Sequence, residues 1–389
     1  MAGRYHMNAT VLLDEVSGLT IQKWNDTGAA IIDGTVELHG GWEQVSDPPS
    51  GAGVLWRSVQ QHAAWQLFRG DLASDGDGGT RDHQAPARWP NARPWTSDCW
   101  DRDDGHWRYE STKSSFGHMV DEGPTAEAET DDEFGFDTTD GTTTFDAGSL
   151  GDINASVADC VAILNIGHWV TMHALVENHT AGSSNFTYSR DNCGSRDCPS
   201  ARHPGDGKGR YFLEFCPQIL DEVGEWSYNG TAGGGTILLR APVGMDPNDY
   251  RYFGKNVTYS LVLRGCSKVT VKGLTFFATT MFDWRSIRTR VDTCHFNYPS
   301  FSKRALLNVR PDQLPSQLGN GEASAWWDGG SQFKITGAMV TGIVTKNTYD
   351  SNSTWFNNVF EYTDGPALKF ERTGYDTVQN NRFYQIDCK

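Results

Sequence analysis

Asn358-Val359-Phe360, near the end of the chain, returns 23 residues later as Asn381-Arg382-Phe383. A looser unit, two residues followed by Phe, occurs as Leu274-Thr275-Phe276 and, 20 residues later, as Cys294-His295-Phe296. A period in the low twenties with one aromatic residue per period is typical of a solenoid, whose coils bury their apolar faces only against each other. Short strands stacked about 4.8 Å apart fit this repeat. The repeat predicts an all-β fold built as a β-helix; the alternative is a set of unrelated β-hairpins.

Composition agrees with an all-β fold. The chain has 389 residues, of which 38% are hydrophobic, so it is long enough for one long solenoid or for two ordinary domains. Glycine is abundant, with 42 residues, and no long amphipathic helical stretch stands out. The net charge of −16 argues against a nucleic-acid partner, because phosphate binding needs a basic face. No run of 18 apolar residues is present, so we expect no membrane-spanning helix.

Two features predict a secreted, extracellular protein. Eight asparagines begin the Asn-X-Ser/Thr signal for N-glycosylation, more than chance would give: Asn8, Asn25, Asn154, Asn178, Asn185, Asn229, Asn256 and Asn352. Eight cysteines fit an oxidising compartment, and Cys193 and Cys198 close a short polar loop that is the best candidate for a local disulfide. A zinc site is the weaker reading of that pair, because no CxxC motif or histidine cluster accompanies it. No signal peptide is visible at the start, so we expect a mature or trimmed form of a eukaryotic protein.

The character of the sequence divides the chain into three regions. Residues 1–60 contain strand-like segments separated by turns and are predicted to be the first coils. Residues 61–152 are predicted to be a loop excursion, first rich in Trp and Arg and then acidic. Its part 121–152 holds eleven carboxylates and no Lys or Arg, which indicates a solvated acidic loop. No cofactor is predicted, although calcium is possible there, because carboxylates suit that ion. Residues 153–389 are predicted to form the main β-helix.

The chain resembles the right-handed parallel β-helix proteins of the pectate-lyase-like superfamily, especially secreted carbohydrate-active members. The likeness covers most of the chain except about 61–85 and 121–152, and it is carried by the Asn-X-Phe repeats and by four segments: Ala2-Gly-Arg-Tyr5, Ile31-Ile-Asp-Gly34, Ala87-Arg-Trp-Pro-Asn91 and Leu220-Asp-Glu-Val-Gly-Glu-Trp226. It implies a right-handed parallel β-helix. It leaves function open, because this fold hosts lyases, hydrolases, esterases, tail spikes and adhesins.

The resemblance also implies where catalysis could occur. Lyases on this fold need a Lys or Arg base, often with a cation, and hydrolases need two carboxylates about 5–10 Å apart. The densest zone of suitable side chains gives five candidate catalytic residues: Asp283, Asp292, His295, Lys303 and Arg304. Four further carboxylates follow on later coils: Asp328, Glu361, Asp364 and Glu371. Each has a plainer interpretation as a turn cap, a surface residue or an ion-pair partner. The zone contains no diagnostic three-aspartate or calcium-binding lyase pattern.

Tryptophan residues indicate possible contacts with sugars, because their rings stack on pyranose faces. Six are candidates for carbohydrate binding: Trp89, Trp95, Trp100, Trp107, Trp326 and Trp327. The alternative is that these rings pack onto the solenoid.

Two functions therefore remain open from the sequence. The repeat runs to both ends of the chain without a capping helix, so open ends could pair with other copies of the protein. This favours a secreted, N-glycosylated structural glycoprotein that stacks head-to-tail into extracellular filaments or a coat, with itself and N-linked glycans as partners. The alternative is a polysaccharide lyase or glycoside hydrolase acting on an extracellular, possibly acidic, polysaccharide. A carbohydrate-binding adhesin is a further alternative.

Overall fold

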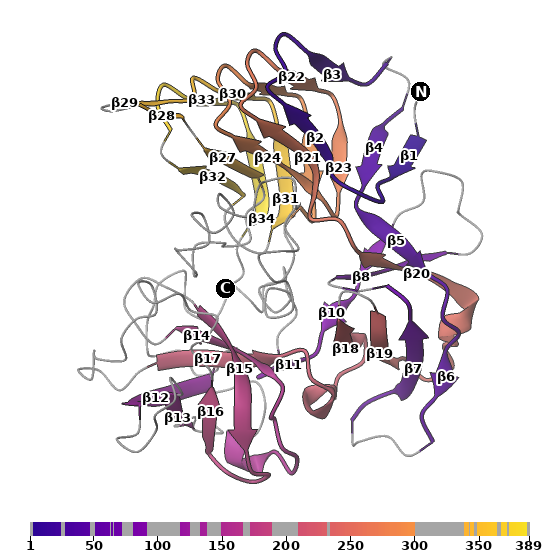
Figure 1. Ribbon diagram of the computed structural model, residues 1–389. Helices are drawn as coiled ribbons and strands as arrows, with labels where there is room; N and C mark the ends of the chain where they lie inside the picture. Colours follow the sequence, from indigo (N-terminus) through magenta and orange to yellow (C-terminus); the bar gives the residue numbers. More distant parts are fainter. Residues whose placement is uncertain are drawn as a thin grey trace.

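The protein is all-β, and it contains parallel sheets as well as antiparallel ones (Figure 1). In this computed structural model the described residues are 3–24, 28–46, 51–71 apart from 63 and 65, 81–91, 117–124, 133–137, 149–165, 172–188, 209–231, 234–299, 338–363 apart from 342, 346 and 347, 367–371 and 373–386.

Three parallel sheets, A, B and C, form one body, which we call the three-sheet stack. In spatial order, sheet A consists of β1 (Gly3–His6), β4 (Ala30–Asp33), β23 (Thr275–Phe277), β26 (His295–Asn297), β31 (Val359–Thr363) and β34 (Arg382–Ile386). Sheet B consists of β2 (Val11–Asp14), β21 (Tyr259–Arg264), β24 (Thr280–Trp284), β27 (Ala338–Thr341) and β32 (Leu368–Glu371). Sheet C consists of β3 (Thr20–Gln22), β22 (Thr270–Lys272), β25 (Arg290–Asp292), β30 (Thr354–Phe356) and β33 (Thr377–Gln379).

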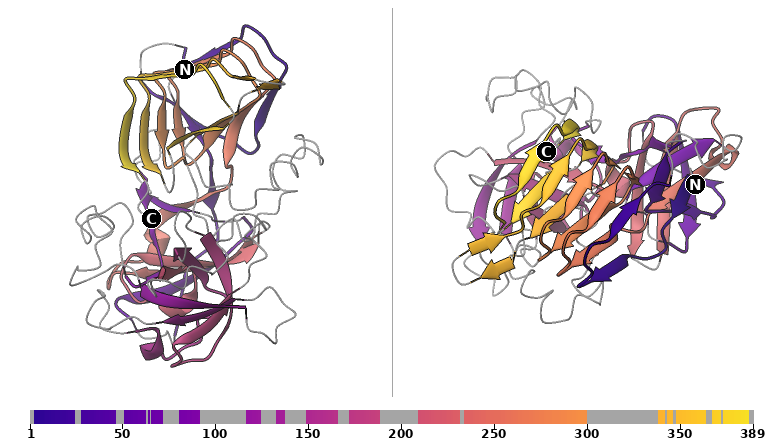
Figure 2. Two further views of the ribbon diagram at one scale, coloured as in Figure 1. Left: turned by 90° about the vertical axis from the view of Figure 1, so that its left-hand side faces the viewer. Right: turned by 90° about the horizontal axis from the view of Figure 1, so that it is seen from above.

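The chain visits the three sheets in a fixed order. Each pass runs through sheet B, then C, then A, and the next pass pairs with it in parallel in all three sheets (Figure 2). A short hairpin of β28 (Ile343–Thr345) and β29 (Thr348–Asp350) interrupts the pass that begins at β27. The inward side chains of all three sheets share one apolar core, which contains residues such as Leu263, Val291 and Trp355.

The repeat that opened the sequence analysis forms two ladders inside the stack. The rings of Phe276, Phe296, Phe360 and Phe383 lie nearly parallel, with centroids 4.9, 4.7 and 5.4 Å apart. Asn358 Nδ2 donates to Asn381 Oδ1 at 2.9 Å, and Cys294 N donates to Asn358 Oδ1 at 2.9 Å. The stacked phenylalanine rings thus fill the core. The asparagine ladder satisfies backbone groups at the corner that precedes sheet A. The alternative of unrelated hairpins is wrong for this part of the chain.

The stack is interrupted by an insertion between β4 and β21. Although 225 residues separate them, β2, β3 and β4 pair in register with β21, β22 and β23. Both ends of the insertion meet at Gly34, whose carbonyl accepts from Asn256 N at 2.9 Å and Val257 N at 3.0 Å. A Cβ at Gly34 would come within 2.7 Å of Val257 O, so this close approach requires glycine.

The insertion contains two antiparallel or mixed sheets and a closed barrel. Sheet D consists of β5 (Thr35–Leu38), β20 (Tyr250–Lys255), β8 (Leu67–Asp71) and β9 (Asp82–His83). Sheet E consists of β10 (Ala85–Pro86), β18 (Glu225–Thr231), β19 (Gly234–Ala241), β7 (Val54–Gln60) and β6 (Glu43–Gln44). The barrel ring consists of β17 (Gly209–Glu214), β12 (Gly117–Pro124), β13 (Glu133–Asp137), β16 (Asn185–Tyr188), β15 (Met172–His179) and β14 (Val161–Asn165), closed by pairing of β14 with β17, with β11 (Arg88–Trp89) added alongside β17. The described part of the insertion also contains the short 3₁₀ helices η2 (Leu150–Asp152), η3 (Pro217–Ile219) and η4 (Pro247–Asp249).

This topology differs from the predicted regions 1–60, 61–152 and 153–389. The excursion begins at Thr35 and ends at Lys255, so the second half of the first region and the first hundred residues of the third belong to the insertion. The third region was predicted to begin too early because Val161–Asn165 is an apolar strand like those of the stack. Only its antiparallel pairing with β15 and β17 shows that it lies in the barrel.

Two motifs of the sequence interlock where the barrel meets sheet E. Arg88 N donates to Glu225 Oε1 at 3.2 Å, and Asn91 Nδ2 donates to Asp221 Oδ1 at 3.2 Å. Trp226 Nε1 donates to Gln84 O at 3.0 Å. Burial, together with the nearby charge of Asp221, raises the pKa of Glu225 well above its usual value. The segments Ala87–Asn91 and Leu220–Trp226 thus form a structural corner.

One disulfide joins Cys160 to Cys216 and belongs to the barrel core. The predicted pair Cys193 and Cys198 lies outside the described residues. In the part of the chain that the structure describes, no helix is long and apolar enough to cross a membrane.

Asp283 is an ionisable side chain in the interior of the stack, at a position where the neighbouring strand has an apolar residue. It lies in register with Leu263 and is 0% exposed. Burial raises its pKa to about 6; the Thr289 and Ser286 hydroxyls offset part of this rise, and the charge of Asp376 adds to it.

We predict that Asp283→Asn stabilises the protein at neutral pH and not in acid. Because the folded-state pKa lies above the unfolded value of 3.8, Asp283 favours folding less as the pH rises from 3.8 through about 6. The unfolding free energy of the wild type, relative to the variant, should fall by about 3 kcal/mol over this range. Denaturant unfolding at several pH values measures it.

Asp292→Asn is the matched control. Burial raises the pKa of Asp292, but hydrogen bonds from Arg290 and Thr293 lower it more, so the net pKa is below its usual value. This variant should lose stability at neutral pH, where the wild-type carboxylate is charged, and less in acid. If the free energies of unfolding of the wild type and of Asp283→Asn differ by the same amount at every pH, the prediction is contradicted.

Candidate functional site

The outer face of sheet A carries two groups of polar side chains. His295 on β26 and Glu361 on the neighbouring β31 both point outward. Each is next in sequence to an inward phenylalanine of the core, Phe296 and Phe360, and side chains alternate along a strand. His295 Nε2 lies 3.0 Å from Glu361 Oε2. Their side chains are 36% and 21% exposed, so the pair is reachable from solvent. A carboxylate in this position orients the imidazole ring.

Aromatic side chains lie near Glu361 on this face. The rings of Tyr298 and Tyr362 stack at 4.7 Å, and His83 of the insertion stacks on Tyr298 at 5.2 Å. Burial raises the pKa of Tyr298, and the neighbouring Tyr362, Asp82 and Glu361 raise it further. Both phenols therefore stay protonated at neutral pH and can donate hydrogen bonds.

An acceptor beside Glu361 has no partner in the described part of the chain. Asn297 lies directly across the ladder from Glu361, and its Oδ1 atom is buried without a hydrogen-bond donor. Buried polar atoms are rarely left unsatisfied, so this position suits a ligand that donates a hydrogen bond, such as a hydroxyl.

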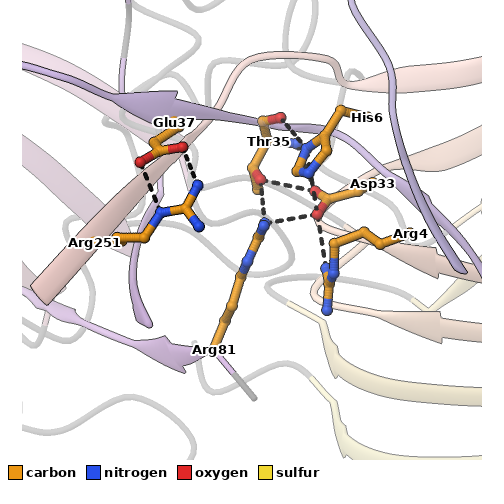
Figure 3. A network of polar contacts seen from close by, with 7 residues as sticks. All are labelled: Arg4, His6, Asp33, Thr35, Glu37, Arg81 and Arg251. Carbon is orange, nitrogen blue, oxygen red and sulfur yellow. Dashed lines mark hydrogen bonds and ion pairs between the residues drawn. The ribbon is translucent and has the colours of Figure 1, made fainter. Parts of the chain in front are cut away.

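A second polar group, the Asp33 cluster, lies further along the same face and consists of Arg4, His6, Asp33, Thr35 and Arg81 (Figure 3). Arg4 Nη1 and Arg81 Nη1 both donate to Asp33 Oδ2, at 2.7 and 2.6 Å. Thr35 N and Oγ1 donate to Asp33 Oδ1, each at 2.8 Å. Arg4 and Asp33 come from the stack, whereas Thr35 and Arg81 come from the insertion, so the cluster joins the two bodies.

A second ion pair lies beside the cluster, on sheet D. Arg251 Nε donates to Glu37 Oε1 at 2.7 Å, and a further bond joins Arg251 Nη2 to Glu37 Oε2 (Figure 3). The hydrogen bonds from Arg251 hold the pKa of Glu37 below its usual value. Arg251 and Arg81 also lie over the ring of Phe253, with distances of 5.3 and 3.5 Å to its centroid.

Phe277 connects the two polar groups along sheet A. The Arg4 guanidinium lies 4.8 Å from the centre of its ring, and Tyr298 packs edge-on against it at 6.0 Å. Arg81 is followed directly by Asp82 and His83, so its anchorage to Asp33 also places His83 on Tyr298.

The structure separates the five predicted catalytic residues. His295 lies on the outer face of sheet A, as described above. Asp283 is enclosed in the stack, where no substrate can reach it, and Asp292 on sheet C is bound to Arg290. Lys303 and Arg304 lie outside the described residues. Of the described residues in the predicted zone, His295 alone lies on this face, because Asp283 is on sheet B and Asp292 is on sheet C.

Among the tryptophans predicted to bind carbohydrate, only Trp89 is described. It is 6% exposed and packs in the barrel core against Tyr211, so its ring does not present a face to a sugar. Trp95, Trp100, Trp107, Trp326 and Trp327 lie outside the described residues.

Several residues of the face were not predicted, although the sequence placed Glu361 among the carboxylates on later coils. Asp33 sits in the segment Ile31-Ile-Asp-Gly34, where a carboxylate among strand residues beside a glycine is a usable signal. Glu361 follows Phe360 in the repeat and is therefore expected to point outward. Nothing local marks Arg4 or Arg81, because their roles depend on pairing between distant segments.

For the other predicted sites, the structure gives only their positions in the fold. The sequon asparagines are exposed at seven positions: Asn8, Asn154, Asn178, Asn185, Asn229, Asn256 and Asn352. Asn25 lies outside the described residues, and glycosylation and secretion stay predictions. Most of the acidic part 121–152 is also outside them, so calcium binding stays untested; in the described ranges no three His, Cys, Asp or Glu side chains gather as metal ligands.

Comparisons with known proteins add little to this geometry. No protein-family model and no curated protein matches the chain. A solved structure titled "Glycoside hydrolase" is similar with a TM-score of 0.47 and 11% identity, covering 92% of this chain and 64% of that one. Another, titled "The complex structure of XylC with xylose", has a TM-score of 0.30 and 11% identity, covering 99% of this chain and 49% of that one. The chain thus spans less than two thirds of either structure's length.

We predict that Asp33→Asn strongly destabilises the protein. The change removes the one carboxylate that two buried guanidinium groups share, and an uncompensated buried charge typically costs about 3–5 kcal/mol. Denaturant unfolding measures the loss. Glu43→Gln, which breaks the exposed pair with Arg57, is the control and should change stability by less than about 1 kcal/mol. Equal effects of the two changes would contradict a structural role for Asp33.

Proposed function

We propose that the protein is a carbohydrate-cleaving enzyme, a polysaccharide lyase or glycoside hydrolase, whose reacting groups lie on the outer face of sheet A. The observation that carries this proposal is the His295–Glu361 pair, 3.0 Å apart and open to solvent on a rigid sheet. Such a pair can give or take a proton at a glycosidic oxygen or at a carbon next to a carboxylate. The stacked tyrosines and Asn297 Oδ1, which has no partner among the described residues, add hydrogen-bonding groups suited to sugar hydroxyls.

The proposal includes the finer architecture. We take the three-sheet stack, with its repeated B–C–A passes and single core, to be a right-handed parallel β-helix of the pectate-lyase-like kind. Such a scaffold supports the function because outward side chains on adjacent strands lie about 4.8 Å apart, which spaces reacting groups along a linear polymer. The substrate we propose is an extracellular polysaccharide, with the secreted location predicted from the sequence.

The test is the activity of the purified protein on a panel of polysaccharides. We expect Glu361→Gln and His295→Gln each to lower the rate by about 10²- to 10⁴-fold, since acid–base groups typically contribute that much. A lyase leaves an unsaturated sugar at the new chain end, whereas a hydrolase leaves only a new reducing end, so product analysis separates the two.

Asp14→Asn is the control for this experiment. It removes a carboxylate that pairs with Arg264 on sheet B, away from the outer face of sheet A, and should leave the rate unchanged. Activity retained in both the Glu361 and the His295 variants would contradict the proposed site.

A structural role through self-association is the second candidate, and a different observation favours it. In the last described pass, Val378 and Phe383 are each 48% exposed, whereas the matching Trp355 and Phe360 one pass earlier are 0% exposed. An apolar surface with free strand edges can pair with another copy.

We predict that, if this surface pairs copies of the chain, light scattering after size-exclusion chromatography will show mass increasing with concentration. Phe383→Lys should then abolish the increase, because the charge would be buried at the contact. A monomer at all concentrations would contradict the assembly.

A further inference from the structure

From β4 to β34, one row of outward side chains on sheet A becomes more exposed along its length. The row contains Asp33, Phe277, Asn297, Glu361 and Tyr384, which pair in register on five consecutive strands. Asp33 is 0% exposed and Phe277 6%, whereas the Glu361 side chain is 21% exposed and Tyr384 42%. Solvent therefore reaches this row at the end that holds Glu361 and Tyr384.

Side chains of the insertion cover the buried end of the row. Arg81 Nη1 donates to Asp33 Oδ2 at 2.6 Å, and the Arg81 guanidinium lies 5.8 Å from the centre of the Phe277 ring. Phe68 on β8 also packs against Phe277, with 5.0 Å between the ring centres. A ligand held at Glu361 can therefore extend over β34, whereas the insertion already covers Asp33 and Phe277.

Tyr384 places an exposed aromatic ring beside Glu361. The two residues are register partners on adjacent strands, which lie about 4.8 Å apart. The ring of Tyr384 packs edge-on against Tyr362, with 5.9 Å between the ring centres and 84° between the ring planes, and the Arg382 guanidinium lies 5.8 Å from its centre. These contacts restrict the ring in the free protein, so covering it with a ligand costs little further conformational entropy.

Sugar rings stack on aromatic side chains of this kind. The face of a pyranose ring carries C–H groups, and a tyrosine ring offers a large apolar surface with few rotatable bonds. If the reacting pair acts on a bond held at Glu361, the sugar unit on the β34 side of that bond lies over Tyr384.

From these observations we infer that the Tyr384 ring binds the sugar unit next to the bond held at the His295–Glu361 pair, on the side away from the insertion. This inference rests on the proposed function for the identity of the ligand. It adds a binding residue and a direction to that proposal, because the polysaccharide then extends from the reacting pair over β34.

The test measures binding by calorimetry in the Glu361→Gln protein, so that turnover does not consume the ligand. The probes are unbranched hexasaccharides of xylose, glucose, mannose and galacturonic acid. We expect at least one probe to bind, and Tyr384→Ala should weaken its binding about three- to tenfold, the usual contribution of a stacked ring. Tyr384→Phe keeps the ring and removes only the hydroxyl, so it should keep the affinity.

A chemical measurement with Tyr384 intact keeps the test valid if Tyr384→Ala does not fold, which thermal unfolding checks. Nitration followed by mass spectrometry reports how accessible each tyrosine ring is, and we expect the bound hexasaccharide to slow the nitration of Tyr384. Tyr375 is the matched control, because it is 78% exposed and precedes β33 of sheet C. Its nitration should be unchanged, and Tyr375→Ala should keep the affinity for each probe.

If no hexasaccharide binds, or if Tyr384→Ala and Tyr375→Ala bind equally well, the inference is overturned. Equal nitration of Tyr384 with and without a saturating probe would also overturn it. The outcome is separable from that of the proposed function. Binding that depends on the Tyr384 ring, in a protein without Glu361-dependent cleavage, would support the sugar site and contradict the enzyme. Glu361-dependent cleavage with a KM that Tyr384→Ala leaves unchanged would do the reverse.

Discussion

The structure depends on one constraint: strands β2, β3 and β4 must pair in parallel with β21, β22 and β23 across the whole insertion. A pass of the stack has unpaired edges and an uncovered apolar side until the next pass is in place. The two ends of the insertion therefore have to return to one point, and Gly34 is where they meet. Asp33, the residue before Gly34, is the centre of the Asp33 cluster, which holds the insertion against sheet A.

Local repeats were enough to predict part of this fold. Phe360 and Phe383 recur with fixed spacing, and a side chain that recurs once per pass must stack on its counterpart in the next pass. The same reasoning failed for Val161–Asn165, which has the composition of a buried strand but pairs in the barrel. Composition describes how a strand is buried, and it does not say which strand lies beside it. The insertion was therefore predicted too short at both of its ends.

The candidate site was predictable to a still smaller extent. His295 was found because it lies in the repeat, and Asp283 was misplaced although it is only twelve residues away. Counting inward and outward positions along each strand separately corrects this error, since Asp283 matches Leu263 in the core and Glu361 follows an inward Phe. Arg4 and Arg81 meet Asp33 only because three distant segments converge, and no local pattern encodes that contact.

The return of the chain to Gly34 also bears on the order of folding during synthesis. Strands β2 and β3 are made long before β21 and β22, the described strands with which they pair, because residues 34–258 lie between them. Contacts of such high sequence separation form slowly, and the entropy of closing the loop is far smaller once the loop is itself compact. The sheets and barrel of the insertion are thus placed to fold first as a unit, bringing its two ends together as a template on which the stack is completed.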